Sequence, residues 1–270
     1  MEGHSKVFSL ESWKLLKITG IDSTRYLQGR LTQDIKALEQ EPAVESLLLS
    51  PQGKILGQLV LFKVKETYFA LAPCPEDQNG ENLVQDLLRF KVADQIEIEA
   101  SQEAVFFSRK ETLSILDEEK INLPLRDIGF FMIGENPKDA AEQSGFSDLC
   151  VAKGYPVFGR DFKNSHTAGV LNLEKFVSFT KGCYAGQEVV EKSVALGRVN
   201  KKLVQLHSPS SIDKKTSEAE LFSDPEQTEV CGVFTSSYSN GSESWGFALL
   251  KNADSQQKVY SQGMTWNLVS

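Results

Sequence analysis

The stretch Lys181-Gly182-Cys183-Tyr184-Ala185-Gly186-Gln187-Glu188 brings together a thiol, a cation, two glycines and an adjacent amide and carboxylate. The residues after Gly186 have helix-forming composition, so Cys183 is expected just before or at a helix N-terminus. The helix dipole and the nearby Lys181 ammonium would both favour the thiolate. Taken alone, Cys183 is either a reactive or ligating thiol or a buried cysteine in a glycine-rich turn, and the buried cysteine is the commoner case.

The length of 270 residues allows a substantial core and favours two or three linked modules. Lys and Arg total 29 against 37 Asp and Glu, and the resulting charge of −8 argues against broad electrostatic binding to nucleic acid or anionic membranes. No apolar run approaches the roughly 20 residues that span a bilayer. The first residues lack a targeting pattern, so we expect a cytoplasmic protein with no nucleic-acid or membrane partner.

The cysteines and histidines are too few and too scattered to make a metal site from this chain alone. The sequence contains only three histidines and no C-x-x-C pair. Its four cysteines are Cys74, Cys150, Cys183 and Cys231. We therefore predict no zinc site and no complete set of iron–sulfur ligands within the chain.

The pattern of apolar and turn residues predicts mixed secondary structure in the first two thirds of the chain. Residues 7–20 are expected to form short strands, 44–72 an antiparallel meander, and 83–88 a helix with one apolar face. Residues 111–127 are charged and poorly patterned, which predicts a connecting region. Asn136, Pro137 and Gly145 predict a short helix between them, with Asn136 as its N-cap.

The pattern of residue types changes after Gly197. Short β-like runs separated by Ser, Asn, Asp and Gly follow it to the end. Their spacing predicts a small antiparallel barrel or sandwich of about 70 residues, with the boundary between modules near residues 195–202.

Four further motifs accompany the opening stretch and stand in a fixed order along the chain. They are YLQGRLTQD at 26–34, SPQGKI at 50–55, GYPVFGRD at 154–161 and LGRVNKKL at 196–203. Together with KGCYAGQE at 181–188, they resemble the pattern of the YgfZ family. These proteins are folate-binding relatives of the glycine-cleavage T protein, and they include mitochondrial iron–sulfur assembly factors. The resemblance runs from about residue 7 to beyond residue 203.

The resemblance implies the α+β folate-binding fold of the T protein. Two interwoven α+β subdomains over residues 1–197 and a C-terminal antiparallel β-barrel over residues 198–270 would together surround a central folate pocket. It also implies tetrahydrofolate or a derivative as the cofactor, and iron–sulfur client or assembly proteins as partners. The activity of the family centres on the signature cysteine, which is Cys183 in this chain.

The matched motifs also supply the candidate site residues, none of which is expected to bind a metal within this chain alone. Cys183 and Lys181 are the candidates for the chemistry, with Lys181 favouring the thiolate. The candidates for cofactor binding are Asp34, Gly182, Tyr184, Gly186, Gln187 and Glu188.

Three departures from the T protein narrow the choice of function. Gly57 and Gln58 stand where the T protein has an acidic pair, and neither can act as a carboxylate base. Ala152 replaces a glutamate associated with the pterin ring. The leading hypothesis is a tetrahydrofolate-binding factor for maturation or repair of iron–sulfur proteins that acts through Cys183, whether or not it is an enzyme. The alternatives are a folate-dependent one-carbon transferase or demethylase of a small amine, and a non-catalytic scaffold.

Overall fold

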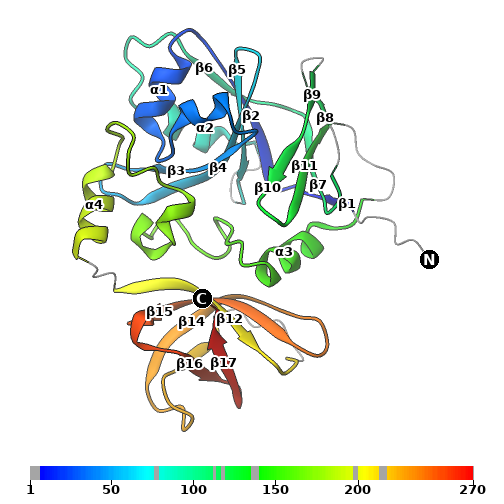
Figure 1. Ribbon diagram of the computed structural model, residues 1–270, viewed down its shortest axis with the longest axis vertical. Coiled ribbons are helices and arrows are strands. Elements are labelled where there is room, and N and C mark those ends of the chain that lie inside the picture. Colours follow the sequence, from blue (N-terminus) through cyan, green and yellow to red (C-terminus); the bar gives the residue numbers. More distant parts are fainter. Residues whose placement is uncertain are drawn as a thin grey trace.

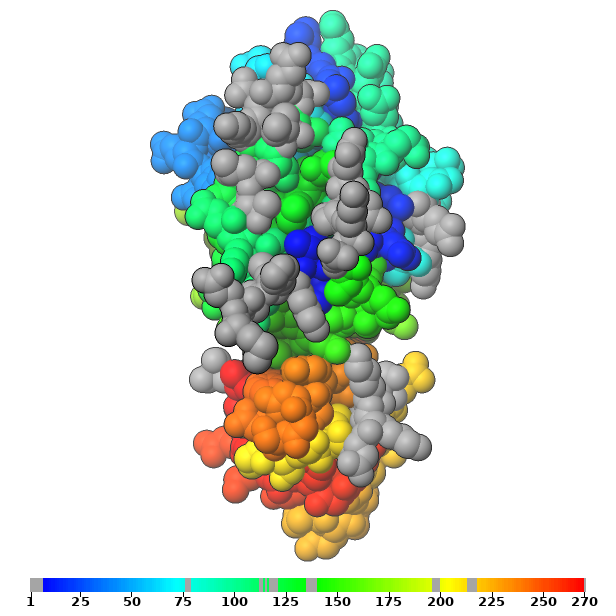
Figure 2. All heavy atoms as spheres, turned by 90° about the vertical axis from the view of Figure 1, so that its right-hand side faces the viewer, coloured from blue at the N-terminus to red at the C-terminus, as the bar shows by residue number. Residues whose placement is uncertain are grey.

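The computed structural model has an α+β body at one end and a closed β-barrel at the other (Figure 1). Figure 2 shows the barrel as a lobe of its own beneath the body. This arrangement confirms the predicted α+β fold with a C-terminal antiparallel barrel. The structure describes residues 7–75, 79–111, 114–116, 119–134, 140–196, 200–212 and 218–269.

A five-stranded antiparallel sheet forms the centre of the body, with the strand order β3-β4-β5-β2-β6. The helices α1 (Ser23–Arg30) and α2 (Glu81–Leu88) cover one face, where Leu27 and Leu87 are fully buried. The meander predicted over 44–72 and the helix predicted over 83–88 are thus confirmed. The strands of this sheet are β2 (Trp13–Thr19), β3 (Val44–Leu49), β4 (Ile55–Val64), β5 (Thr67–Pro73) and β6 (Glu97–Ala100).

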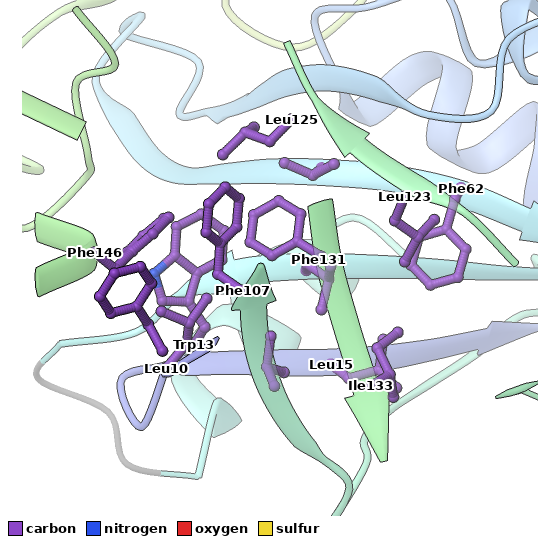
Figure 3. Close-up of a cluster of buried hydrophobic side chains, with 14 of the residues drawn as sticks. Leu10, Trp13, Leu15, Phe62, Phe107, Leu123, Leu125, Phe131, Ile133 and Phe146 are labelled. Atoms are coloured by element: carbon purple, nitrogen blue, oxygen red, sulfur yellow. The ribbon is translucent and has the colours of Figure 1, made fainter. Parts of the chain in front are cut away.

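A smaller sheet packs against the other face, with the strand order β1-β7-β11-β10. Aromatic rings fill the space between the two sheets (Figure 3), and the ring centroids of Trp13 and Phe131 lie 5.0 Å apart. Phe146 of helix α3 (Gln143–Ala152) closes this core at one end. The strands of the smaller sheet are β1 (Val7–Ser9), β7 (Ala104–Ser108), β10 (Leu123–Leu125) and β11 (Gly129–Gly134).

The predicted connection over residues 111–127 is wrong. The strands β8 (Ser114–Leu116) and β9 (Glu119–Ile121) form a hairpin, and β10 then joins the smaller sheet. Each strand has only three residues, which is too short for an alternating pattern to stand out from the charged residues around it. Leu116, Leu123 and Leu125 are buried, so packing on the core overrides the polar composition.

The predicted helix between Asn136 and Gly145 is also corrected. Asn136 and Pro137 lie outside the described residues, whereas Gly145 lies inside α3 rather than after a helix end. A Cβ at position 145 would come within 2.5 Å of the Phe8 ring. The glycine therefore permits close packing of α3 on β1, which the sequence pattern does not distinguish from a helix stop.

Short helical segments connect the body to the barrel. The 3-10 helices η2 (Ala168–Val170) and η3 (Leu173–Lys175) precede the KGCYAGQE loop, and helix α4 (Gln187–Leu196) follows it. A third cluster of buried residues lies here, and Leu249 of the barrel packs in it beside Phe176. The 3-10 helix η1 (Ile35–Glu39) follows the loop after α1.

The barrel closes in the order β12-β15-β14-β13-β16-β17, which decides between the predicted barrel and sandwich. Trp266 and Phe234 pack at its centre with ring centroids 4.9 Å apart. Residues 197–199 are outside the described residues, so the boundary after residue 197 stays a prediction. The strands are β12 (Lys201–Ser208), β13 (Glu220–Phe222), β14 (Val230–Ser239), β15 (Ser244–Lys251), β16 (Lys258–Ser261) and β17 (Met264–Leu268), with η4 (Ala253–Ser255) between β15 and β16.

Within these ranges, no helix is both long enough and apolar enough to span a bilayer.

Candidate functional site

Cys183 is exposed in the loop that precedes α4, as its place before a helix-forming stretch predicts. None of the four cysteines forms a disulfide, and the other three are buried. Exposure rules out the interpretation of Cys183 as a buried structural cysteine. In the described part of the chain, no cluster of three or more His, Cys, Asp or Glu side chains is placed to hold a metal ion.

The loop that carries Cys183 is fixed to the segment after α1. The Lys181 ammonium donates hydrogen bonds to the carbonyl oxygens of Leu31 at 2.6 Å and Gln33 at 2.9 Å. The backbone N–H of Ala185 donates to the Gly29 carbonyl at 3.1 Å. These bonds join two sequence motifs about 150 residues apart and hold the loop on both sides of the exposed thiol.

The glycine at 186 brings a third motif to the same place. Gly186 has a φ of +86°, and a Cβ there would lie 2.6 Å from the Ser50 carbonyl oxygen. Gly53, in the same turn as Ser50, is packed equally closely against Val189 of α4. Three of the five motifs, at 26–34, 50–55 and 181–188, therefore meet around Cys183.

Lys181 carries its charge in a partly buried position. Burial lowers the pKa of its ammonium to about 8, and the Asp34 carboxylate opposes this shift. The ammonium also lies 5.4 Å from the centre of the Tyr184 ring, a cation–π arrangement. Lys181 therefore anchors the loop to the neighbouring backbone, and its action on the thiol stays a prediction.

We expect the position of Lys181 to show in the pH dependence of stability. Its pKa of about 8 in the fold lies below the value of about 10.4 in an unfolded chain, so the unfolded chain binds more protons between these values. Stability contributed by this residue therefore rises as the pH increases from 8 to about 10.5. Urea unfolding of the wild type and of Lys181→Met should show their difference changing in favour of the wild type over this range. A constant difference would contradict the burial of the charge.

Two residues predicted to bind a cofactor, Asp34 and Gln187, form hydrogen bonds within the protein. The Asp34 carboxylate accepts from Gln28 Nε2 at 2.8 Å and from the backbone N–H of Lys36 at 3.1 Å. Gln187 Oε1 accepts from the backbone N–H of Tyr184 at 3.3 Å. The Gln187 side chain therefore stabilises the loop that carries Cys183, and the Asp34 side chain stabilises the segment after α1 that contacts this loop.

The remaining members of the predicted set differ in exposure. Tyr184 is buried and Gly182 is exposed, and a Cβ at Gly182 would meet no atom within 4 Å. Glu188 is exposed and pairs with Lys192 at 2.6 Å across one turn of α4. Their role toward a cofactor stays a prediction.

A cavity of about 390 Å³ opens between α2, the start of β4 and the loop at 158–164. We call it the Gly57 cavity, because it lies at the position where the acidic pair is absent. Gly57 leaves room there, since a Cβ would come within 2.8 Å of Leu83. Its lining includes Gly57, Asn82, Asp86, Arg89, Phe158 and Lys163.

The motif at 154–161 holds one wall of this cavity. Gln58 is buried and donates to the Tyr155 hydroxyl at 3.0 Å, while its Oε1 accepts from the backbone N–H of Phe158 at 2.9 Å. The Gln58 amide, which stands at the position of a carboxylate in the T protein, therefore forms structural hydrogen bonds. These bonds fix the backbone of Phe158 in the wall of the cavity.

Sequence reasoning missed the polar wall that α2 supplies. Asn82, Gln85, Asp86 and Arg89 recur at helical spacing opposite the apolar face, and all four line the cavity. That spacing predicts an exposed polar face as readily as a site. Only the fold shows that Phe158 and Lys163 lie across from it.

Comparisons with known proteins show which sequences this chain resembles. The sequence matches no family model. It is 27% identical over 231 residues to the tRNA-modifying protein YgfZ of Hamiltonella defensa, covering 73% of this chain and 68% of the relative. The YgfZ protein of Colwellia psychrerythraea is 24% identical over 234 residues, with 75% and 71% covered.

A solved structure extends the likeness to the whole chain. The aminomethyltransferase T of the glycine cleavage system from Bartonella henselae superposes with a TM-score of 0.78 at 16% identity. The match covers 99% of this chain and 86% of that one, and it shows a shared fold. The chain is therefore a distant homologue of the YgfZ proteins, built on the fold of the glycine-cleavage T protein.

Proposed function

We propose that this protein is a tetrahydrofolate-binding factor that serves the maturation or repair of iron–sulfur proteins and acts through Cys183. The observation that carries the proposal is the exposed thiol on a loop anchored by Lys181, Ala185 and Gly186. A thiol fixed at the surface can form a transient bond to a partner or supply one ligand to a shared cluster.

The partners follow from the chemistry of a single thiol. A cubane cluster takes four ligands, so the other three would come from glutathione, a second copy of this chain, or a client or assembly protein, which is the source we propose. The relatives are named tRNA-modifying proteins. We therefore propose that the clients include an iron–sulfur enzyme of tRNA modification, and that the protein works in the cytoplasm.

The Gly57 cavity has the chemistry to hold a reduced folate. A folate combines a flat pterin ring, a benzoyl group and an anionic glutamate tail. Phe158 offers a face for ring stacking, and Asn82 and Asp86 offer polar groups for the pterin edge. Lys163 offers a cation for the tail carboxylates, and the ion pair of Arg89 with Asp86 at 2.5 Å lies in the same lining. When bound, the folate would carry one-carbon units.

The residues at the missing acidic pair favour this proposal over an aminomethyl transfer. Both polar atoms of the Gln58 amide are used, by Tyr155 and by the backbone of the 154–161 motif. Gly57 has no side chain. Neither position supplies the carboxylate that a one-carbon transfer from an amine would use as its base.

Titration with a reduced folate tests the cavity. We expect Phe158→Ala to raise the dissociation constant by about tenfold, because a stacked ring contributes on the order of 1 kcal/mol beyond its buried area. Phe179→Ala is the matched control, because Phe179 is an aromatic residue outside this cavity, and it should bind as the wild type does. Equal affinities of the Phe158 variant and the wild type in calorimetry would contradict this placement of the folate.

Deletion of the gene tests the cellular role. In cells lacking the protein we expect the specific activity of iron–sulfur enzymes to fall, and the wild-type chain to restore it. A dehydrogenase without a cluster should keep its activity in the same extracts. If the iron–sulfur enzymes were unaffected by the deletion, the maturation role would be wrong.

A further inference from the structure

A groove lies beside the loop that carries Cys183 and is separate from the Gly57 cavity. Its volume is about 480 Å³, and it runs between η2 and η3, α4 and the start of β12. Apolar side chains dominate its lining and include Leu171, Leu173, Phe179, Val194 and Leu203. We call it the β12 groove.

Phe179 and Val194 expose apolar surface at this groove. Their exposed fractions are 53% and 52%, although both side chains are apolar. Phe179 precedes Cys183 by four residues, and four residues of extended chain span at most about 14 Å. A molecule bound in the groove therefore lies within reach of the thiol.

The strand β12 borders the groove with its edge. Lys202, Leu203 and Val204 all line the groove, whereas successive side chains of a strand point to opposite faces. Three consecutive residues can line one groove only when the strand presents its edge to it. On its other side β12 is paired with β15 along its whole length.

This edge has backbone groups available for pairing. The last strand, β17, pairs with β12 only at Leu206 and His207, and the N–H of Val269 donates to the Gln205 carbonyl at 2.9 Å. The backbone groups of every second residue point the same way, so those of Leu203 and Lys201 also point to this side. Among the described residues, neither has a backbone hydrogen bond there.

We propose that the β12 groove docks an extended segment of a client polypeptide, which pairs antiparallel to β12 in line with β17. The proposal rests on the proposed function, because it names how a client is held beside Cys183. Main-chain hydrogen bonds to Leu203 and Lys201 supply the register, and apolar side chains of the segment contact Phe179 and Val194.

Charge selects the kind of segment. Lys201 is exposed at the open end of the edge, whereas the next residue of the strand, Lys202, is already paired with Asp254 at 2.7 Å. Lysine on a strand edge disfavours pairing with an uncharged apolar strand. An acidic residue facing Lys201 removes that penalty, so the docked segment alternates apolar residues with at least one acidic residue.

A competitor segment attached to the chain itself tests the proposal. Because Val269 already pairs with Gln205, residues appended after Ser270 continue along the free edge. Appended Val-Thr-Glu-Thr, which places a glutamate opposite Lys201, should slow hydrogen exchange at the amides of Leu203 and Lys201 at least tenfold. It should also reduce restoration of iron–sulfur enzyme activity at least fivefold, with unchanged affinity for reduced folate. Appended Pro-Thr-Pro-Thr places proline at both positions opposite Leu203 and Lys201, so it cannot donate the bonds and should behave as the wild type.

A second pair of variants tests the apolar lining of the groove separately from the edge of β12. Val194→Arg should block docking and reduce the restored activity, whereas Val230→Arg, at an exposed valine on the barrel, should not. Absence of exchange protection by Val-Thr-Glu-Thr would overturn the edge pairing. Protection with full activity, or an active Val194→Arg variant, would overturn the docking site. Both activity measurements require that cells lacking the protein lose iron–sulfur enzyme activity. If those cells show no loss, the proposed function is wrong, and this outcome is distinct from a failure of the docking site.

Discussion

Replacing Cys183 with serine is expected to abolish restoration of iron–sulfur enzyme activity in cells lacking the protein. The thiol is exposed, so the substitution should change the free energy of unfolding by less than about 0.5 kcal/mol. Serine keeps the size of the side chain but is a poor nucleophile and a poor ligand for iron at neutral pH. The loss of activity would then report on thiol chemistry rather than on folding.

The control for this experiment is Thr180→Ser, a conservative change at an exposed position in the same segment. It should restore activity fully. Extracts would be assayed for an iron–sulfur dehydratase, and the level of the variant protein would be measured in parallel. A Cys183→Ser variant as active as the wild type would rule out the thiol mechanism while leaving folate binding to its own titration.

The local elements were predictable where they are long and regularly patterned. The helix α4 follows from composition and the glycine before it, and the meander β3-β4-β5 follows from its turn residues. The hairpin β8-β9 and the strand β10 were missed because three residues carry too little periodicity. The place of Gly145 in α3 depends on Phe8, a contact that spans more than 130 residues.

The motifs predict which residues lie near Cys183, but they do not predict what these residues contact. The motifs identify Lys181 and Asp34, yet a motif does not show whether a side chain contacts a ligand or its own chain. The structure gives Lys181 two backbone carbonyls and Asp34 a glutamine and an amide. The Gly57 cavity needed the fold, because its walls come from α2 and from a loop about 75 residues later.

The largest effect on stability is expected at Asp161, the last residue of the 154–161 motif. Its side chain is fully buried and accepts hydrogen bonds from the backbone N–H of Val157 at 2.8 Å, from Arg160, and from Ser236 of the barrel strand β14. Burial tends to lower the pKa of Arg160, but the Asp161 carboxylate outweighs this and raises it. One carboxylate therefore fixes the loop, neutralises a largely buried guanidinium and joins the body to the barrel.

Asp161→Ala should lower the free energy of unfolding by about 3 kcal/mol, because it leaves Arg160 without its counter-ion and removes the tie to the barrel. Asp161→Asn keeps the shape and one acceptor and should cost about half as much. Ser236→Ala removes a single bond to a charged group and should cost about 1.5 kcal/mol. Urea unfolding would rank the three, and a loss below about 1 kcal/mol for Asp161→Ala would contradict this account. Because the same loop presents Phe158 to the Gly57 cavity, Asp161→Ala should also weaken binding of reduced folate, whereas Ser236→Ala leaves the loop contacts in place and should not.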